Sequence, residues 1–199
     1  MARKSKRAVS SDEILKTALD LAEEAGWTSV RLRQIAGQLD CSLSDVALHY
    51  RDLDAIADAW FVQAWQAMLA TMEPTFYDRP VKERLYILMT RWLDALGEHR
   101  QVSVAMLETK LYLGHPHHWV PMIFNLSRTV QWLRDAAGLD RGGRWRQVEE
   151  IGLTSLFLAT LLKWCRDTSD GQEQTRRFLE RSLSASDRLM AIPLTRHAK

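Results

Sequence analysis

The sequence contains little cysteine and no long apolar run, and each shortage excludes a class of protein. Cys41 and Cys165 are the two cysteines among 199 residues, too few for a disulfide framework or a cysteine-based metal site. No stretch of 18 uninterrupted apolar residues occurs, so we expect no membrane-spanning helix. No apolar segment follows the basic N-terminus, as it would in a secretory signal. These shortages favour a protein of the cytoplasm.

Strand signals are missing as well. No segment alternates apolar and polar residues with a period of two between turn residues. The five prolines and nine glycines instead separate stretches in which apolar residues have helical spacing. The sequence therefore predicts an all-α fold of about nine helices. The six later helices are expected over about 53–72, 80–97, 100–113, 116–138, 144–167 and 172–191.

Capping signals mark the first helices. Ser10 and Glu13 have the spacing of a capping box, and Gly26 is expected to end the helix that they begin. Ser42 is expected to cap a short helix over 43–50, and Asp52 the long helix that follows. Three short helices with tight links are typical of a helix-turn-helix unit. In the first helix, the residues expected to face inward are Ile14, Ala18, Leu21 and Ala25.

Residues 14–56 carry a family resemblance. This stretch, ILKTALDLAEEAGWTSVRLRQIAGQLDCSLSDVALHYRDLDAI, resembles the N-terminal head of TetR-type transcriptional regulators, with agreement at Gly26, Ile35, Ser42 and Tyr50. The resemblance implies a homodimeric repressor that binds a DNA operator and is released by a small lipophilic ligand. The implied parts are a basic arm (1–10), a DNA-binding head (11–52), a ligand-binding and dimerisation domain (53–192) and a tail (193–199).

The head departs from the family pattern at positions that contact DNA in the family. Ala47 and Leu53 replace a tyrosine and a lysine that contact phosphate in the family, and Asp45 replaces a hydroxyl residue. Residues 11–60 have a net charge of −6, whereas residues 1–10 carry +4. The third helix could therefore serve only to pack the head. The predicted DNA contacts are Arg3, Lys4, Lys6, Arg7, Arg31, Arg33, Gln34, Ser42, Ser44, His49 and Arg51.

A second resemblance supports an alternative function. Residues 163–183, KWCRDTSDGQEQTRRFLERSL, resemble the end of lipid-binding accessory proteins of ubiquinone biosynthesis. The shared spacing consists of Asp167, Ser169, Thr175, Phe178 and Leu179. Those proteins have the TetR fold but do not act on DNA. The alternative is therefore a protein that binds a quinone or isoprenoid lipid and does not bind DNA.

The later helices supply candidate ligand and dimer contacts. Large, adaptable side chains could line a pocket for a lipophilic ligand or could form an ordinary core. The candidates are Trp60, Trp65, Met68, Met89, Trp92, Met106, Met122, Trp132 and Phe157. Small and apolar residues on the last two helices allow close approach of a second copy. The predicted dimer contacts are Val148, Ile151, Ser155, Ala159, Phe178 and Ser182.

The sequence offers little for catalysis or for binding metals. In HPHHW (115–119), His117 and His118 are adjacent, so on a helix they point about 100° apart. No cysteine, aspartate or glutamate lies within four residues of this cluster. No nucleophile with a base and no glycine-rich phosphate loop occurs. We therefore expect no enzyme activity, no metal and no cofactor.

Overall fold

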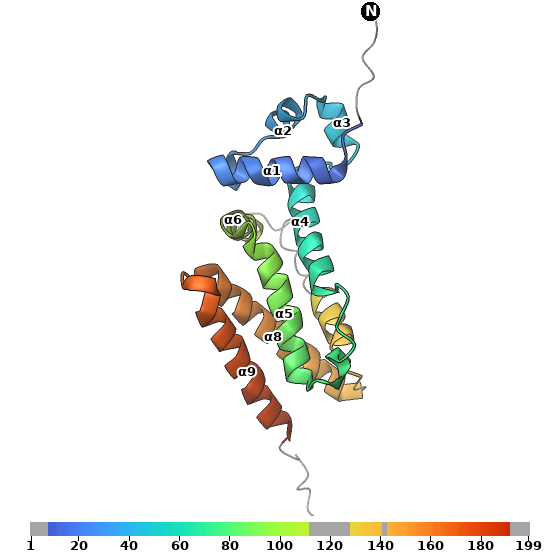
Figure 1. Ribbon diagram of the computed structural model, residues 1–199, viewed down its shortest axis with the longest axis vertical. Helices are drawn as coiled ribbons and strands as arrows, with labels where there is room; N and C mark the ends of the chain where they lie inside the picture. The colour runs from blue at the N-terminus through green and yellow to red at the C-terminus, as the bar shows by residue number, and fades with distance from the viewer. Residues whose placement is uncertain (1–7, 112–127, 141–142, 192–199) are drawn as a thin grey trace, which may run out of the picture. The chain divides into compact units, whose positions relative to one another are not determined.

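The computed structural model describes residues 8–111, 128–140 and 143–191, and these ranges contain helices and no strand (Figure 1). The predicted all-α fold is confirmed. Residues 128–136 are also helical. The other helices are α1 (Ser11–Ala25), η1 (Trp27–Ser29), α2 (Leu32–Gln38), α3 (Leu43–Ala47), α4 (Leu53–Met68), η2 (Phe76–Asp78), α5 (Val81–Gly97), α6 (Arg100–Leu111), α8 (Gly143–Arg166), η3 (Asp170–Gln172) and α9 (Glu173–Ala191).

The chain forms two compact units. One consists of Met1–Trp65 and Ala95–Trp119, and the other of Gln66–Asp94 and Val120–Lys199. Helices α4 and α5 each pass from one unit into the other, and α6 belongs with the N-terminal helices. No helix in the described ranges is both long enough and apolar enough to cross a membrane.

Helix α1 begins and ends where the sequence predicts, but it buries a different face. Ser10 and Glu13 form the capping box, and Gly26 ends the helix with a φ of 82°, a value that glycine adopts without strain. Leu21 is half-buried and Ala25 is exposed, so the predicted inward face was wrong in part. Burying a leucine stabilises more than burying an alanine, which favours the observed rotation. The buried residues are Ile14, Leu15, Ala18, Leu19 and Ala22.

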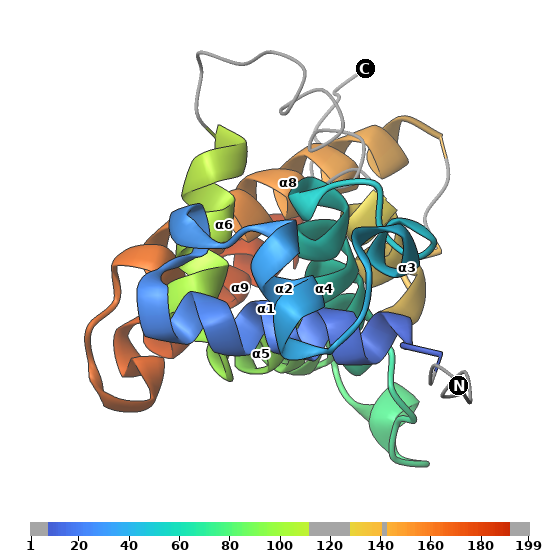
Figure 2. The same cartoon turned by 90° about the horizontal axis from the view of Figure 1, so that it is seen from above.

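Helices α2 and α3 pack on each other, and α2 packs on α1 (Figure 2). Ile35 and Ala36 are the buried residues of α2, as predicted. Asp40 has a φ of 48° in the tight turn before α3, a conformation that aspartate tolerates better than most residues. Helix α6 contacts α1 on the side away from α2 and α3 (Figure 1). These contacts define the N-terminal unit.

The later helices follow the predicted order, with ends that differ by one to a few residues. The Asp52 carboxylate accepts a hydrogen bond from the Ala55 amide, 2.7 Å away, which confirms its capping role, but α4 ends at Met68 instead of about 72. Pro80 precedes α5, and its carbonyl accepts from the amides of Glu83 and Arg84. The predicted end of the sixth helix and start of the seventh lie outside the described residues. Helices α8 and α9 lie side by side in the second unit (Figure 1).

Candidate nucleic-acid interface

Helix α3 packs through one face and leaves the other open. Val46 is buried, and so is Tyr50 just after the helix. The outward positions are Leu43, Ser44, Ala47 and Leu48. Two of the predicted contacts, Ser44 and His49, are therefore exposed. The large exposed apolar side chains at 43 and 48 were not singled out from the sequence, because periodicity alone does not show which apolar residues a five-residue helix buries.

Asp45 has a local structural role. Its Oδ2 accepts hydrogen bonds from the Ser42 amide (2.8 Å) and the Ser42 hydroxyl (2.7 Å), while the Asp45 amide donates to Ser42 Oγ (3.2 Å). This capping box begins α3 and resembles the one that begins α1. Asp45, which replaces a hydroxyl residue of the family pattern, therefore serves as part of the cap of α3.

The other predicted DNA contacts lie around α2 and after α3. The Arg31 guanidinium donates to the carbonyls of Thr28 and Val30, each at 2.8 Å, while the Arg31 amide donates to Gln34 Oε1 at 2.7 Å. Arg33 is exposed. Arg51 is exposed and pairs with Asp52 at 3.0 Å. The arm residues Arg3, Lys4, Lys6 and Arg7 lie outside the described residues.

Tyr50 closes the three-helix unit. Its hydroxyl donates to the Ser11 carbonyl at the start of α1, 3.3 Å away. Burial raises the pKa of this phenol, and the nearby Asp12 carboxylate raises it further, so the hydroxyl stays protonated at neutral pH. The tyrosine thus fixes the end of α3 to α1 through both packing and a hydrogen bond.

Side-chain contacts tie α6, and His99 just before it, to the other helices of the first unit. His99 Nδ1 lies 2.6 Å from Glu23 Oε1 of α1. Trp60 Nε1 of α4 donates to Ser103 Oγ at 2.8 Å, and the same hydroxyl donates to the Leu96 carbonyl at 2.9 Å. The third contact joins Lys110 Nζ to Asp58 Oδ1 at 2.8 Å. These contacts explain why α6 belongs to the unit that contains α1 to α3.

The predicted ligand contacts are mostly core residues. Within the first unit Trp60 and Met106 are buried, and Trp65 is half-buried. The second unit buries Met68, Met89, Trp92 and Phe157, and the Trp92 and Phe157 rings pack with their centroids 4.9 Å apart. Met122 lies outside the described residues.

Trp132 has a different environment from the other candidates. It is half-exposed and lines an open hollow of about 650 Å³. The hollow is polar, because two arginines and two aspartates share its wall, so it does not match the apolar pocket that the sequence predicts. Its lining residues are Gln131, Trp132, Arg134, Asp135, Leu139, Asp140, Gly143 and Arg146.

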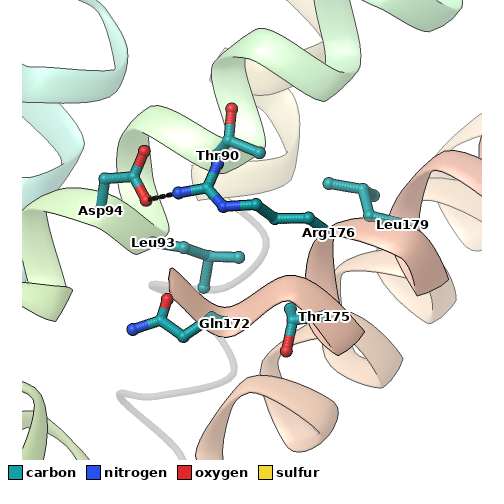
Figure 3. A pocket seen from close by; sticks show the side chains of 7 residues that line it. All are labelled: Thr90, Leu93, Asp94, Gln172, Thr175, Arg176 and Leu179. Carbon is teal, nitrogen blue, oxygen red and sulfur yellow. Dashed lines mark hydrogen bonds and ion pairs between the residues drawn. The ribbon is translucent and has the colours of Figure 1, made fainter. Parts of the chain in front are cut away.

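A smaller cavity lies between α5 and the start of α9. It has a volume of about 10 Å³, which leaves space for about one water molecule. Figure 3 shows Leu93 of α5 facing Leu179 of α9, with Arg176 paired to Asp94 at the rim. This cavity is a packing defect in the contact between two helices and is too small for a lipophilic ligand.

One face of α8 is apolar and exposed. Ile151 is 68% exposed, and Val148, Leu158 and Leu162 are each about half-exposed. Gly152, Ser155 and Ala159 are exposed between them. On α9, Phe178 and Ser182 are half-buried. All six predicted dimer contacts thus remain accessible to some degree in the single chain.

The turn between α8 and α9 is built around a buried carboxylate. Asp167 accepts hydrogen bonds from the amide and hydroxyl of Ser169 and from the amide and hydroxyl of Thr175, the latter two at 2.7 and 2.6 Å. Burial alone would raise the pKa of Asp167, but these four hydrogen bonds outweigh it and hold the pKa well below its usual range. The Asp-x-Ser spacing followed by threonine therefore stabilises the turn between α8 and α9 in this chain.

We expect Asp167→Ala to lower the free energy of unfolding at pH 7 by about 2–4 kcal/mol, because two buried donors of Thr175 and two half-buried donors of Ser169 lose their acceptor. The native carboxyl has the lower pKa, so its contribution is complete above the unfolded value of about 3.9 and is lost as the pH falls below it. Urea unfolding at pH 7 and pH 3 measures both effects. Asp170→Ala, an exposed change in the same turn, should cost about 0.5 kcal/mol or less. Equal losses for the two variants would contradict the prediction.

Comparison with solved structures identifies the family. The chain is 38% identical to a TetR transcriptional regulator from Nitrosomonas europaea, over 89% of this chain and 97% of that one, with a TM-score of 0.79. A TetR regulator from Rhodococcus is 15% identical with a TM-score of 0.68, covering 92% of this chain and 96% of its own, and shows the fold alone. The chain belongs to the TetR family of transcriptional regulators. No curated protein matches it.

The second resemblance has a match of its own. The family model described as COQ9 matches residues 150–190, which cover most of α8, the following turn and α9. In this chain, Asp167, Ser169 and Thr175 join the two helices by hydrogen bonds, and Leu179 is buried. These residues are thus accounted for by the helix pair and need no lipid to explain them.

Proposed function

We propose that this TetR-family regulator binds an operator through α2 and α3 as a homodimer and is released by a small lipophilic ligand. The observation that carries the proposal is the outward face of α3, which no described part of the head covers, in a chain of this family. The second helix of a helix-turn-helix unit enters the major groove. Asp45 does not lie on this outward face, because its carboxylate is half-buried and hydrogen-bonded to Ser42 in the helix cap.

The dimer is proposed to form through α8 and α9. The exposed face of α8 combines large apolar side chains with Gly152, Ser155 and Ala159, and small residues let helices approach closely. An exposed apolar face of this kind is characteristic of an interaction site. Two copies would present two heads to two half-sites, so the operator should have twofold symmetry.

Release by a ligand is the third part of the proposal. The methionine and tryptophan side chains of the later helices pack as core in the single chain, and an apolar ligand would have to enter by displacing such adaptable side chains, which favours it over a nucleotide or an ion. A bound ligand would have to favour one separation of the two heads over another, since only differential affinity shifts an equilibrium. Native mass spectrometry of the purified chain tests for a bound molecule, and operator titration with and without that molecule tests for release.

DNA binding is expected to depend on the basic arm. The head has few cations, so deleting residues 1–9, which leaves the capping Ser10, should weaken operator binding by about 10- to 100-fold at moderate salt. The slope of log affinity against log salt should fall by up to about 0.9 for each lost phosphate contact. Selection from randomised duplex DNA supplies the operator, and fluorescence anisotropy at several salt concentrations measures the affinity.

A length-matched control separates charge from chain length. Replacing Arg3, Lys4, Lys6 and Arg7 by glutamine should reproduce the effect of the deletion. An arm deletion with no effect on affinity would show that the head alone makes the phosphate contacts. If the wild-type chain selects no DNA even at low salt, the regulator mechanism fails, and lipid binding without DNA is the function to keep.

A further inference from the structure

The face that α3 leaves open is apolar, which is unusual for a DNA-reading surface. Leu48 is 80% exposed, the highest value among the large apolar side chains of the described residues, and Leu43 is 53% exposed. Leu43 and Ala47 lie one turn apart, as do Ser44 and Leu48, so the four residues form one patch. We call these four residues the α3 patch. Among the described residues of the head, the packing does not account for this patch.

The surroundings of the α3 patch favour DNA over an apolar partner. The four residues of the patch have no ionisable side chain, and Asp45, the one acid on the helix, is half-buried and bonded to Ser42 in the capping box. Two exposed cations lie nearby: Arg33 on α2, and Arg51 just after α3, which pairs with Asp52 at the surface. A neutral apolar surface with cations nearby fits the major groove, where phosphates border the base edges.

The major groove presents one apolar group, the C5-methyl of thymine, beside hydrogen-bonding groups. A leucine side chain cannot bond the polar base edges, but it is long enough to cover that methyl group. On the basis of the proposed function, we propose that the α3 patch, chiefly Leu48, reads thymine methyl groups in each half-site of the operator. Leu48 is then a specificity-determining residue, and Ser44 is the polar member that can bond a neighbouring base edge.

The size of the effect follows from the surface that a methyl group buries. Removing one buried methyl contact should weaken binding about fourfold. A dimer reads two half-sites, so loss of one methyl in each should weaken operator binding about 15-fold. Such a ratio is well within reach of an anisotropy titration.

The experiment replaces thymine by uracil, which removes only the methyl group. An operator is first selected with the full wild-type chain from randomised synthetic DNA, which contains no 5-methylcytosine. Each thymine of the half-site is then exchanged for deoxyuridine, one symmetric pair at a time, and the affinities are compared. The same series is measured for Leu48→Ala and for Val62→Ala, a control at a half-exposed position on α4. Circular dichroism checks that each variant is folded.

When uracil replaces thymine at one or more symmetric pairs, the operator affinity of the wild type and of Val62→Ala should fall about 15-fold. Leu48→Ala should bind the thymine and uracil operators with equal affinity. For each protein we compare the ratio of its affinities for the thymine and uracil operators. Any effect of uracil on DNA stiffness is common to all three proteins and therefore cancels in this comparison. If the wild type binds the operator but does not distinguish uracil from thymine, or if Leu48→Ala keeps the full ratio, this inference is overturned and the proposed function stands. If no DNA is selected at all, the proposed function fails, and the inference fails with it.

Discussion

Replacing Ser155 and Ala159 together by glutamate is expected to make the chain monomeric at micromolar concentration and to weaken operator binding by more than about 100-fold. Both residues are exposed on α8 between Ile151 and Leu162. Four charges, two from each copy, would have to be buried without partners in the proposed seam. A monomer also loses the second half-site, and that linkage contributes about 10²- to 10⁴-fold to affinity.

Light scattering after size exclusion measures the mass, and anisotropy with the selected operator measures the affinity. The control is Gln63→Glu with Gln66→Glu, which adds the same charge at two exposed positions on α4. That variant should remain dimeric. A wild-type chain that is already monomeric, or a double variant on α8 that still dimerises, would refute the proposed interface.

Glu149→Ala is expected to lower the free energy of unfolding by about 3–5 kcal/mol. The Glu149 side chain is 3% exposed and pairs with Arg134, 12% exposed, whose Nε and Nη2 both lie 3.4 Å from Glu149 Oε2. The pair joins α8 to the helix over 128–136 in the second unit. Removing the carboxylate leaves the charge of a largely buried guanidinium without this partner, and breaking a buried pair in this way is strongly destabilising.

The adjacent residue provides the matched control. Glu150 pairs with Arg146, which lies one turn earlier on the exposed side of the same helix. Arg146 Nε and Glu150 Oε1 are 2.8 Å apart. An exposed pair of this kind contributes only about 0.3–0.5 kcal/mol, so Glu150→Ala should have little effect. Urea unfolding at pH 7 compares the two variants. A loss at Glu149 no larger than that at Glu150 would show that the buried pair does not stabilise the second unit.

Features set by neighbouring residues were predictable from the sequence. The caps at Ser10, Ser42 and Asp52 and the end of α1 at Gly26 are all observed, because each depends on contacts within three or four residues. The order of helices was predictable for the same reason. The resemblance to the TetR family rested on this local framework and is confirmed.

Features set by distant contacts were not predictable. The rotation of α1, the short α3 and the half-exposed Trp132 depend on which helices pack against each segment. Charge counting does not show the second role of Asp45, whose carboxylate also caps α3. The proposed DNA, ligand and dimer contacts depend on molecules that the single chain does not contain, so they remain predictions.

The place of α6 in the first unit has a consequence for how the protein is made. Glu23 and His99 are separated by 76 positions, yet their contact belongs to the unit that holds the three N-terminal helices. During synthesis on the ribosome, α1 to α3 emerge well before α6, and closing such a long loop slows folding. The N-terminal unit therefore cannot be completed until α6 has been synthesised. A nascent chain that stalls before His99 lacks the contact between Glu23 and His99.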